Sequence, residues 1–345
     1  MNEENRSRGW TAAFLRGAAL LFLLALVLLP STVHAASPTR LIPVGRAVGI
    51  KLFSDGVVVV GTSEVVTETG RVNPAKNCGL KEGDIITHIN STEVDSIEEV
   101  ETLLQQLEGE PMSIRATRGE KQVQLTARAV FCPADSSYKL GAWIRDSMAG
   151  IGTVTYYNPD TGAFGALGHG INDVDTALLM PLEEGSILPA TVTGVKKGEA
   201  GTPGQLKGSF APSSLGTLEG NTRQGIFGTL ARTDWVTGAA LEVARRDEVE
   251  CGPATILSNV SGDTVEEYSI EICKFYSGED GDCRDFMISV TDPRLLETTG
   301  GIVQGMSGSP ICQNGKIVGA VTHVLVNDPT RGYGIFIENM LEAAE

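Results

Sequence analysis

Hydrophobic and polar residues alternate over short distances along most of the chain, a pattern typical of β-strands. In the first third, β-branched or alternating runs occupy residues 57–60, 85–89, 112–116 and 122–127. The last two runs flank Arg118-Gly119-Glu120, which favours a tight turn between them. This region therefore predicts several short strands, including one hairpin.

One segment between these runs has helical periodicity. Four apolar residues fall on one helical face: Ile97, Val100, Leu104 and Leu107. Ser96 precedes them as an N-cap, and Glu99 completes a capping box. Together with the strands, this helix predicts a compact α+β domain over residues 41–130.

From Phe131 onward, strand-like runs are separated by Gly, Pro, Asn and Asp. They occupy residues 150–157, 190–195, 225–230 and 316–326, and only residues 338–344 favour a helix. A β-rich stretch of roughly 210 residues fits a sandwich or a double barrel. The prediction is a mainly β protein, with the α+β domain at 41–130 followed by an all-β domain at 131–345.

The N-terminus has a different pattern. Arg6, Arg8 and Arg16 precede the unbroken apolar run Gly17–Leu29, and Val33-His34-Ala35 has small residues of the kind that a signal peptidase accepts. Residues 1–36 are therefore expected to be a signal peptide or, alternatively, a retained membrane anchor. Both alternatives place the remainder of the chain outside the cytoplasm.

Composition narrows the function classes. The 345 residues carry a net charge of −16, which makes the chain a poor nucleic-acid binder. The six cysteines permit up to three disulfides in an exported protein, and Cys273 and Cys283 flank a turn-rich segment that such a bond would close. Free buried thiols are the alternative. Because no Cys-x-x-Cys pair occurs, a zinc site is not expected.

Residues 79–90, GLKEGDIITHIN, resemble the central turn and strand of PDZ domains, and the predicted helix resembles the one that borders the PDZ peptide groove. In that family, an apolar-Gly-apolar loop binds a terminal carboxylate with backbone N–H groups. Val48, Gly49 and Ile50 are the matching residues. The resemblance implies peptide binding at these three positions, with an internal packing module as the alternative.

The segment Gly305-Met306-Ser307-Gly308-Ser309-Pro310 contains a candidate nucleophile, Ser307. Glycine two residues before a serine allows a tight turn that directs the amides of Gly305 and Ser307 to one point, as an oxyanion hole requires. Gly308 is expected to leave room for substrate. Ser309 is a rival nucleophile without this flanking pattern, and a simple β-turn is the non-catalytic alternative.

A serine nucleophile needs a base, and three histidines follow the N-terminal segment. His169 lies among small residues in GALGHGI, where an uncrowded imidazole would accept a proton. His323 lies on a predicted strand after Ser307 and is an alternative base or a substrate-pocket residue. His88 belongs to the PDZ-like strand, where we expect no catalytic role.

A carboxylate that orients the imidazole is harder to choose from spacing. Asp292 ends an apolar run and precedes Pro293, so it lies where a strand ends. Asp173, four residues after His169, and Asp160 compete with it. The residues themselves leave the three alternatives open.

The whole arrangement resembles the SpoIVB-type sporulation serine peptidases, in which an N-terminal membrane-targeting segment and a PDZ domain precede the peptidase domain. The resemblance rests on four segments: GALGHGI, VTDPR, GMSGSP and AVTHVLVNDPTRGYG. Carried over to this chain, it implies a triad of His169, Asp292 and Ser307 in a chymotrypsin-like double barrel. Serine acyl transfer itself needs no cofactor.

The resemblance also implies a biological role. Members of this family act between forespore and mother-cell membranes, cleave themselves near the N-terminus, and then cut a membrane-bound regulator of an intramembrane metalloprotease that activates a late sigma factor. We expect self-cleavage within residues 37–44, with the PDZ groove holding the N-terminal region. The alternatives are an HtrA-like quality-control protease, in which PDZ follows the catalytic domain, and a noncatalytic PDZ scaffold.

Overall fold

The structure, a computed structural model, describes residues 39–276 and 283–345. The predicted signal peptide or anchor at 1–36 lies outside the described residues. Within the described ranges, no helix is long and apolar enough to cross a membrane.

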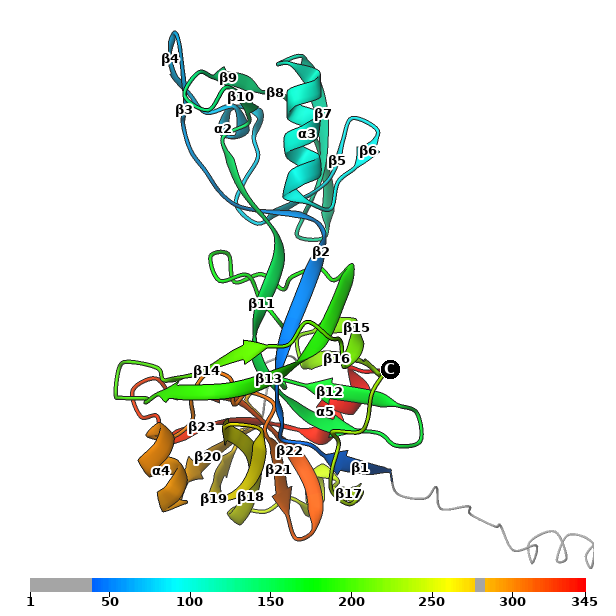
Figure 1. The fold of residues 1–345 in the computed structure, drawn as a ribbon, viewed down its shortest axis with the longest axis vertical. Helices are drawn as coiled ribbons and strands as arrows, with labels where there is room; N and C mark the ends of the chain where they lie inside the picture. Colours follow the sequence, from blue (N-terminus) through cyan, green and yellow to red (C-terminus); the bar gives the residue numbers. More distant parts are fainter. Residues whose placement is uncertain (1–38, 277–282) are drawn as a thin grey trace, which may run out of the picture. The chain divides into compact units, whose positions relative to one another are not determined.

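The first of two β-barrels closes on itself through antiparallel pairing (Figure 1). Around the ring, each strand pairs with the next and the last pairs with the first. The order is β11 (Ala142–Tyr157), β12 (Ala163–Ala166), β16 (Gly225–Leu230), β15 (Gly216–Thr222), β13 (Glu184–Lys196) and β2 (Ala47–Thr62). β14 (Gln205–Phe210) pairs with β13. Phe164, Ile187 and Ile226 fill the interior and are at most 1% exposed.

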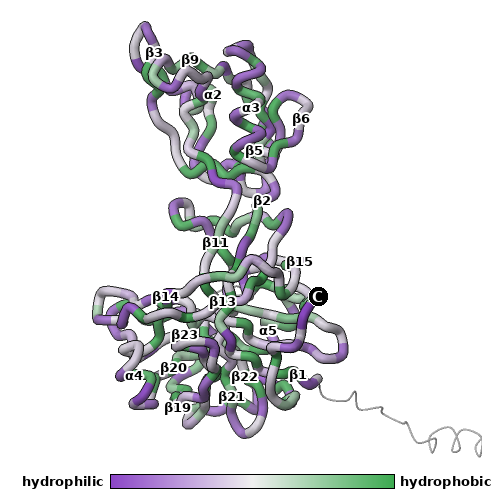
Figure 2. The backbone as a smooth tube through the Cα atoms, in the orientation of Figure 1, coloured by the Kyte–Doolittle hydropathy of each residue, from purple (hydrophilic) through white to green (hydrophobic). Residues whose placement is uncertain are grey.

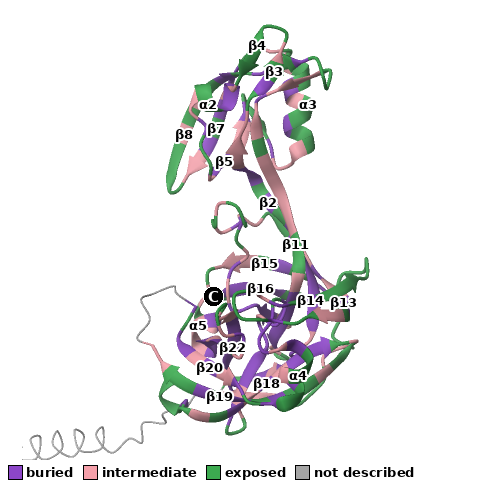
Figure 3. Ribbon diagram, turned by 90° about the vertical axis from the view of Figure 1, so that its left-hand side faces the viewer, coloured by how far each residue is buried: buried purple, intermediate pink, exposed green. Residues whose placement is uncertain are grey.

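The second barrel closes in the same way. Its ring is β18 (Gly252–Ser261), β19 (Thr264–Phe275), β20 (Phe286–Val290), β23 (Arg331–Phe336), β22 (Lys316–Val324) and β21 (Pro310–Gln313). Ile256, Ile288 and Ile311 are fully buried inside it. Figure 3 shows buried stretches along strands of both barrels, such as β16 and β18. The predicted double barrel is confirmed.

Short elements complete the all-β part. They are β1 (Arg40–Pro43), β17 (Leu241–Val243), the 3₁₀ turn η1 (Arg246–Glu248), α4 (Pro293–Thr299) and α5 (Ile337–Glu342). β1 pairs with both β11 and β17, and β17 runs parallel to β22.

The α+β domain also has the expected elements. They are β3 (Val65–Thr67), β4 (Gly70–Val72), α2 (Pro74–Cys78), β5 (Asp84–Ile89), β6 (Thr92–Glu93), α3 (Ile97–Leu107), β7 (Pro111–Arg118), β8 (Lys121–Arg128), β9 (Val130–Cys132) and β10 (Ser137–Lys139). The capping box of Ser96 and Glu99 is formed at the start of α3. Hydrophobic and hydrophilic residues alternate along this helix (Figure 2), whose Val100 and Leu104 are buried.

The two domains share strands, so the predicted boundary at residue 130 does not describe how the sheets divide. Residues 47–53 of β2 pair with β13 and β11 in the first barrel, whereas Val57 and Val58 of the same strand pair with β5. The α+β domain is thus inserted between β2 and β11. The order of apolar and polar residues along this strand of 16 residues does not reveal where its partners change.

The shared strand also corrects the predicted carboxylate-binding loop. Val48, Gly49 and Ile50 lie inside the first barrel, where the strand pairs with β11 on one edge and β13 on the other. A Cβ at Gly49 would lie 2.5 Å from the ring of Phe210, so this glycine allows packing against an aromatic side chain. With both strand edges occupied, these residues have no free edge for a peptide.

Candidate active site

The turn that contains Ser307 follows α4 and leads into β21 of the second barrel. Gly305 and Gly308 have φ of 100° and 95°, a region that favours glycine. A Cβ at Gly308 would lie 2.0 Å from the carbonyl oxygen of Thr153 and 2.5 Å from the nitrogen of Leu167. Gly308 therefore lets the backbone of the first barrel approach the nucleophile, rather than leaving room for substrate as expected.

The backbone amides around Ser307 are oriented by the carbonyls of their own peptide groups. The Gln304 carbonyl accepts from the Leu206 N–H at 2.8 Å, and the Met306 carbonyl accepts within the turn at 2.9 Å. In a planar trans peptide the N–H points away from the C=O, so the N–H groups of Gly305 and Ser307 face the opposite side. In the part of the chain that the structure describes, neither N–H donates a hydrogen bond. This is the arrangement that an oxyanion hole requires.

Thr153 of β11 fastens this turn to the first barrel. Its buried Oγ1 donates to the Gly305 carbonyl at 2.8 Å, and its N–H donates to the Ser307 carbonyl at 3.0 Å. The two barrels therefore fix the orientation of the serine turn together.

His169 follows β12 of the first barrel, after two residues in the left-handed region, Leu167 with φ 69° and Gly168 with φ 68°. Its Nδ1 lies 2.8 Å from the Gly170 carbonyl. Since a carbonyl only accepts, Nδ1 carries the hydrogen and Nε2 is left to accept a proton. Burial lowers the pKa of His169 below its ordinary value, although the hydrogen bond to Gly170 opposes this effect. The ring is therefore neutral at pH 7 and suited to act as a base.

A cavity of about 470 Å³ brings the predicted residues together. Gly305, Ser307, His169 and His323 all line it, and most of its other lining side chains are apolar. The imidazole rings of His169 and His323 are 5.1 Å apart. The Ser307 hydroxyl donates to the Thr322 carbonyl at 2.8 Å, so it must rotate to hand its proton to His169.

Asp292 is not brought to His169. Its carboxylate caps α4 by accepting from the Arg294 N–H at 2.9 Å, and it forms an ion pair with the Arg294 guanidinium at 3.0 Å. Hydrogen bonds from Arg294 lower the pKa of Asp292 to about 2. Among the described contacts none joins Asp292 to His169. The orienting role that the resemblance assigned to this residue is therefore not supported by the geometry.

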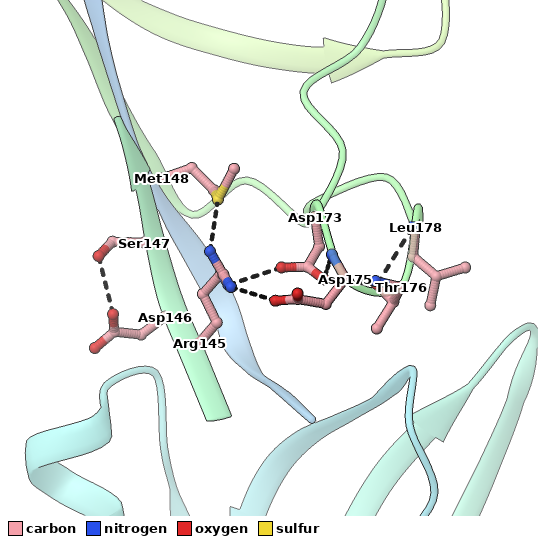
Figure 4. A network of polar contacts seen from close by, with 8 residues as sticks. All are labelled: Arg145, Asp146, Ser147, Met148, Asp173, Asp175, Thr176 and Leu178. Atoms are coloured by element: carbon pink, nitrogen blue, oxygen red, sulfur yellow. Dashed lines mark hydrogen bonds and ion pairs between the residues drawn. The ribbon is translucent and has the colours of Figure 1, made fainter. Parts of the chain in front are cut away.

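The other acid candidates are also directed elsewhere. The Asp173 side chain is fully buried and forms an ion pair of 2.7 Å with Arg145 (Figure 4). Its other oxygen accepts from the backbone N–H groups of Asp175 and Thr176, which shapes the turn. Asp160 is exposed. Within residues 39–276, neither carboxylate forms a hydrogen bond or an ion pair with His169.

The remaining candidates have structural surroundings. Ser309 is fully buried and its hydroxyl donates to Ser258 at 3.1 Å. His88 contacts Thr87 on β5, at 3.1 Å. Of the two alternatives for Cys273 and Cys283, a disulfide is not formed: Cys273 is exposed, whereas the buried Cys283 thiol donates to a backbone carbonyl.

We also searched the described ranges, 39–276 and 283–345, for side chains that could bind a metal ion. There, no group of three or more His, Cys, Asp and Glu side chains is placed to hold a metal ion.

Two closed barrels that meet at a serine turn, with a neutral histidine and two unbonded amides, define a double-barrel serine peptidase that carries an inserted domain. The family described as SpoIVB peptidase S55 matches residues 136–341, and the PDZ domain family matches residues 70–118. Because the first match spans more than half of the chain, the chain belongs to the SpoIVB peptidase S55 family. It is a serine peptidase with a PDZ domain.

Individual relatives are similar over parts of the chain. The zinc metalloprotease RasP of Shouchella clausii is 38% identical over 79 residues, which are 23% of this chain and 18% of that protein. The PDZ domain of the SdrC-like protein Lmo2051 from Listeria monocytogenes is 23% identical, covering 26% of this chain and 87% of that one, with a TM-score of 0.22. The active form of the Rv3671c protease from M. tuberculosis is 17% identical, covering 58% and 75%, with a TM-score of 0.32.

Proposed function

We propose that this peptidase acts in sporulation signalling, outside the cytoplasm between the forespore and mother-cell membranes. It cleaves itself near the N-terminus and then cuts a membrane-bound regulator, which releases an intramembrane metalloprotease and activates a late sigma factor. The family to which the chain belongs supports the sporulation role. The observation that carries the peptidase mechanism is the meeting of Ser307, His169 and two unbonded amides at one cavity.

The proposed reaction is acyl transfer through Ser307. The hydroxyl leaves the Thr322 carbonyl, at the cost of about 1 kcal/mol for one hydrogen bond, and turns toward Nε2 of His169. His169 takes the proton while Oγ attacks the scissile carbonyl, and the developing oxyanion accepts from the N–H groups of Gly305 and Ser307. His169 then protonates the leaving amine. In the second half of the reaction, His169 takes a proton from a water molecule that attacks the acyl-enzyme carbonyl, and it returns this proton to Oγ of Ser307 as the acyl group leaves.

The cavity wall indicates which side chains the site accepts. It is mostly apolar, with Ile171, Ile302 and Val324 among its residues, so an uncharged apolar side chain fits best beside Ser307. His323 lines the same cavity and is the polar contact that we assign to substrate.

The position of β1 refines the expected self-cleavage site. Residues 40–43 pair with β11 and β17, and Leu41 is fully buried. A peptide bond in that strand is not accessible to a protease, because cleavage needs an extended, exposed segment. The burial of β1 supports a cut before Arg40, in the N-terminal part of the expected 37–44 range or upstream of it.

A fluorophosphonate probe tests the mechanism on the full-length chain. The probe should label the parent protein, and Ser307→Ala and His169→Ala should abolish labelling, whereas Ser309→Ala should keep it as a matched control. Labelling that persists in Ser307→Ala would refute the nucleophile. N-terminal sequencing of the parent and Ser307→Ala proteins tests self-cleavage, which predicts a new terminus at or before Arg40 in the parent alone.

A further inference from the structure

One peptide group next to His169 is hydrogen-bonded at both ends. The Gly170 carbonyl lies 2.8 Å from Nδ1 of His169, and the Ile171 N–H of the same peptide group donates to Oδ1 of Asn221 at 2.8 Å. A chain of hydrogen bonds therefore runs from Asn221 through a single planar peptide to the imidazole. Hydrogen bonds in such a chain polarise one another in a low-dielectric interior.

Asn221, at the end of β15, has its whole amide engaged. Its Nδ2 donates to the Ile171 carbonyl at 2.9 Å and to the Met180 carbonyl at 2.8 Å. The two donors and the acceptor have distinct backbone partners, which fixes the orientation of the amide. Asn221 thereby ties together both ends of the segment that follows His169.

Two further contacts hold this segment against the first barrel. The Gly170 N–H donates to the Arg223 carbonyl at 3.1 Å, and the buried Asp173 pairs with Arg145 of β11 (Figure 4). The Gly170–Ile171 peptide group is therefore held through hydrogen bonds of both residues that form it. It cannot rotate without breaking several of them.

We propose that Asn221 is a positioning residue for His169, which acts through the Gly170–Ile171 peptide group in the place that a carboxylate holds in the Ser-His-Asp triad. This inference rests on the proposed roles of Ser307 and His169. Its basis is that Asp173 and Asp292 are held by arginines instead, and that the third candidate acid, Asp160, is exposed.

The chemistry of this arrangement differs from that of a charged triad. A polarised carbonyl holds the tautomer with the hydrogen on Nδ1, but it stabilises the imidazolium ion less than a carboxylate does. The described cavity wall carries no Asp, Glu, Lys or Arg side chain, and His323 of β22 is the titratable group that faces His169 across it. Arg223 contributes a backbone carbonyl to the segment.

Two substitutions of Asn221 separate positioning from general support. Asn221→Ala removes the acceptor for the Ile171 N–H, so fluorophosphonate labelling of the full-length chain at pH 7 should slow by roughly 10–100-fold, as for a misplaced catalytic group. Asn221→Asp keeps the acceptor for the Ile171 N–H and adds a negative charge next to the polarised peptide, while its second oxygen replaces the donor to the Ile171 and Met180 carbonyls. It should label faster than Asn221→Ala, and the acid limb of its pH–rate profile should move to higher pH than in the parent.

Thr222→Val is the matched control, because Thr222 lies beside Asn221 and its hydroxyl bonds only locally, to Gly225 and Gln224. The probe should label this variant at the parent rate, and the acid limb of its pH–rate profile should lie at the same pH as in the parent. Labelling of Asn221→Ala at the parent rate would overturn the inference, and so would an equal loss in both Asn221 variants with unmoved acid limbs. If Asn221→Ala fails to fold, the acid limb of Asn221→Asp decides. Persistent labelling of Ser307→Ala or His169→Ala would instead reject the proposed function.

Discussion

The ion pair of Asp292 with Arg294 gives a quantitative test of what Asp292 does. The Asp292 side chain is 8% exposed and accepts hydrogen bonds from the Arg294 backbone and guanidinium, as well as from the Ser269 N–H at 3.3 Å. Replacement by Asn keeps a good helix cap but removes the charge. We therefore expect Asp292→Asn to lower stability while leaving the active-site geometry in place.

The magnitude follows from the pKa. Asp292 titrates at about 2 in the folded protein, against an ordinary value of about 3.9. A shift of that size corresponds to roughly 2.5 kcal/mol, and the exposed Arg294 guanidinium, screened by water, reduces it to about 1–2 kcal/mol. Because the folded pKa is lowered, this stability is fully present above about pH 4 and is lost as the pH falls toward 2.

Thermal and urea denaturation of the parent and Asp292→Asn proteins across this pH range measure the effect. The variant should unfold about 2–5 °C lower at pH 7, and the difference should shrink toward zero near pH 2. Its turnover should fall only in proportion to the fraction that is unfolded. A fully folded variant whose turnover drops by about 10⁴ would refute this reasoning, because that is the loss expected for an orienting acid.

Three further outcomes follow from the structure. Because burial lowers the pKa of His169, labelling of Ser307 should rise with pH through a limb below pH 6.5 and be flat at pH 7; a limb above pH 7 would contradict the neutral base. Gly308→Ala should cost more than about 3 kcal/mol, measured by denaturation, since its Cβ would meet the Thr153 carbonyl, whereas Gly315→Ala, with open space around it, should cost only about 1 kcal/mol. Arg118→Met should destabilise the PDZ domain by about 3 kcal/mol, because it leaves the fully buried Asp84 carboxylate without its guanidinium partner. Hydrogen exchange on β5 and β7 should then increase. Substitution of the exposed Arg115 by Met serves as the control.

Local patterns predicted much of the fold. The capping box at Ser96 identified α3, alternation identified most strands, and glycines around Ser307 identified the turn, because each signal lies within a few residues. His169 was found from small flanking residues and from the scarcity of histidines. These features depend on chemistry that neighbours in the sequence supply.

The remaining features depend on contacts between distant segments. Thr153 fastens a turn that lies more than 150 residues away, and Asn221 holds a peptide 50 residues before it. Val48, Gly49 and Ile50 matched a loop motif, but strands from later in the chain occupy both of their edges. A position that ends a strand, such as Asp292, gives no information about which side chain it will face.

The insertion of the PDZ domain into the hairpin of β2 and β11 affects how truncated versions of this protein must be interpreted. A fragment that begins at residue 131 would lack β1 and all of β2, and so would open the first barrel beside β11, whose Thr153 holds the serine turn. Inactivity of such a fragment would report a broken barrel and would carry no information about peptide recognition. A fair deletion keeps residues 47–53 and rejoins them through a short turn to residue 147, which pairs with Phe53.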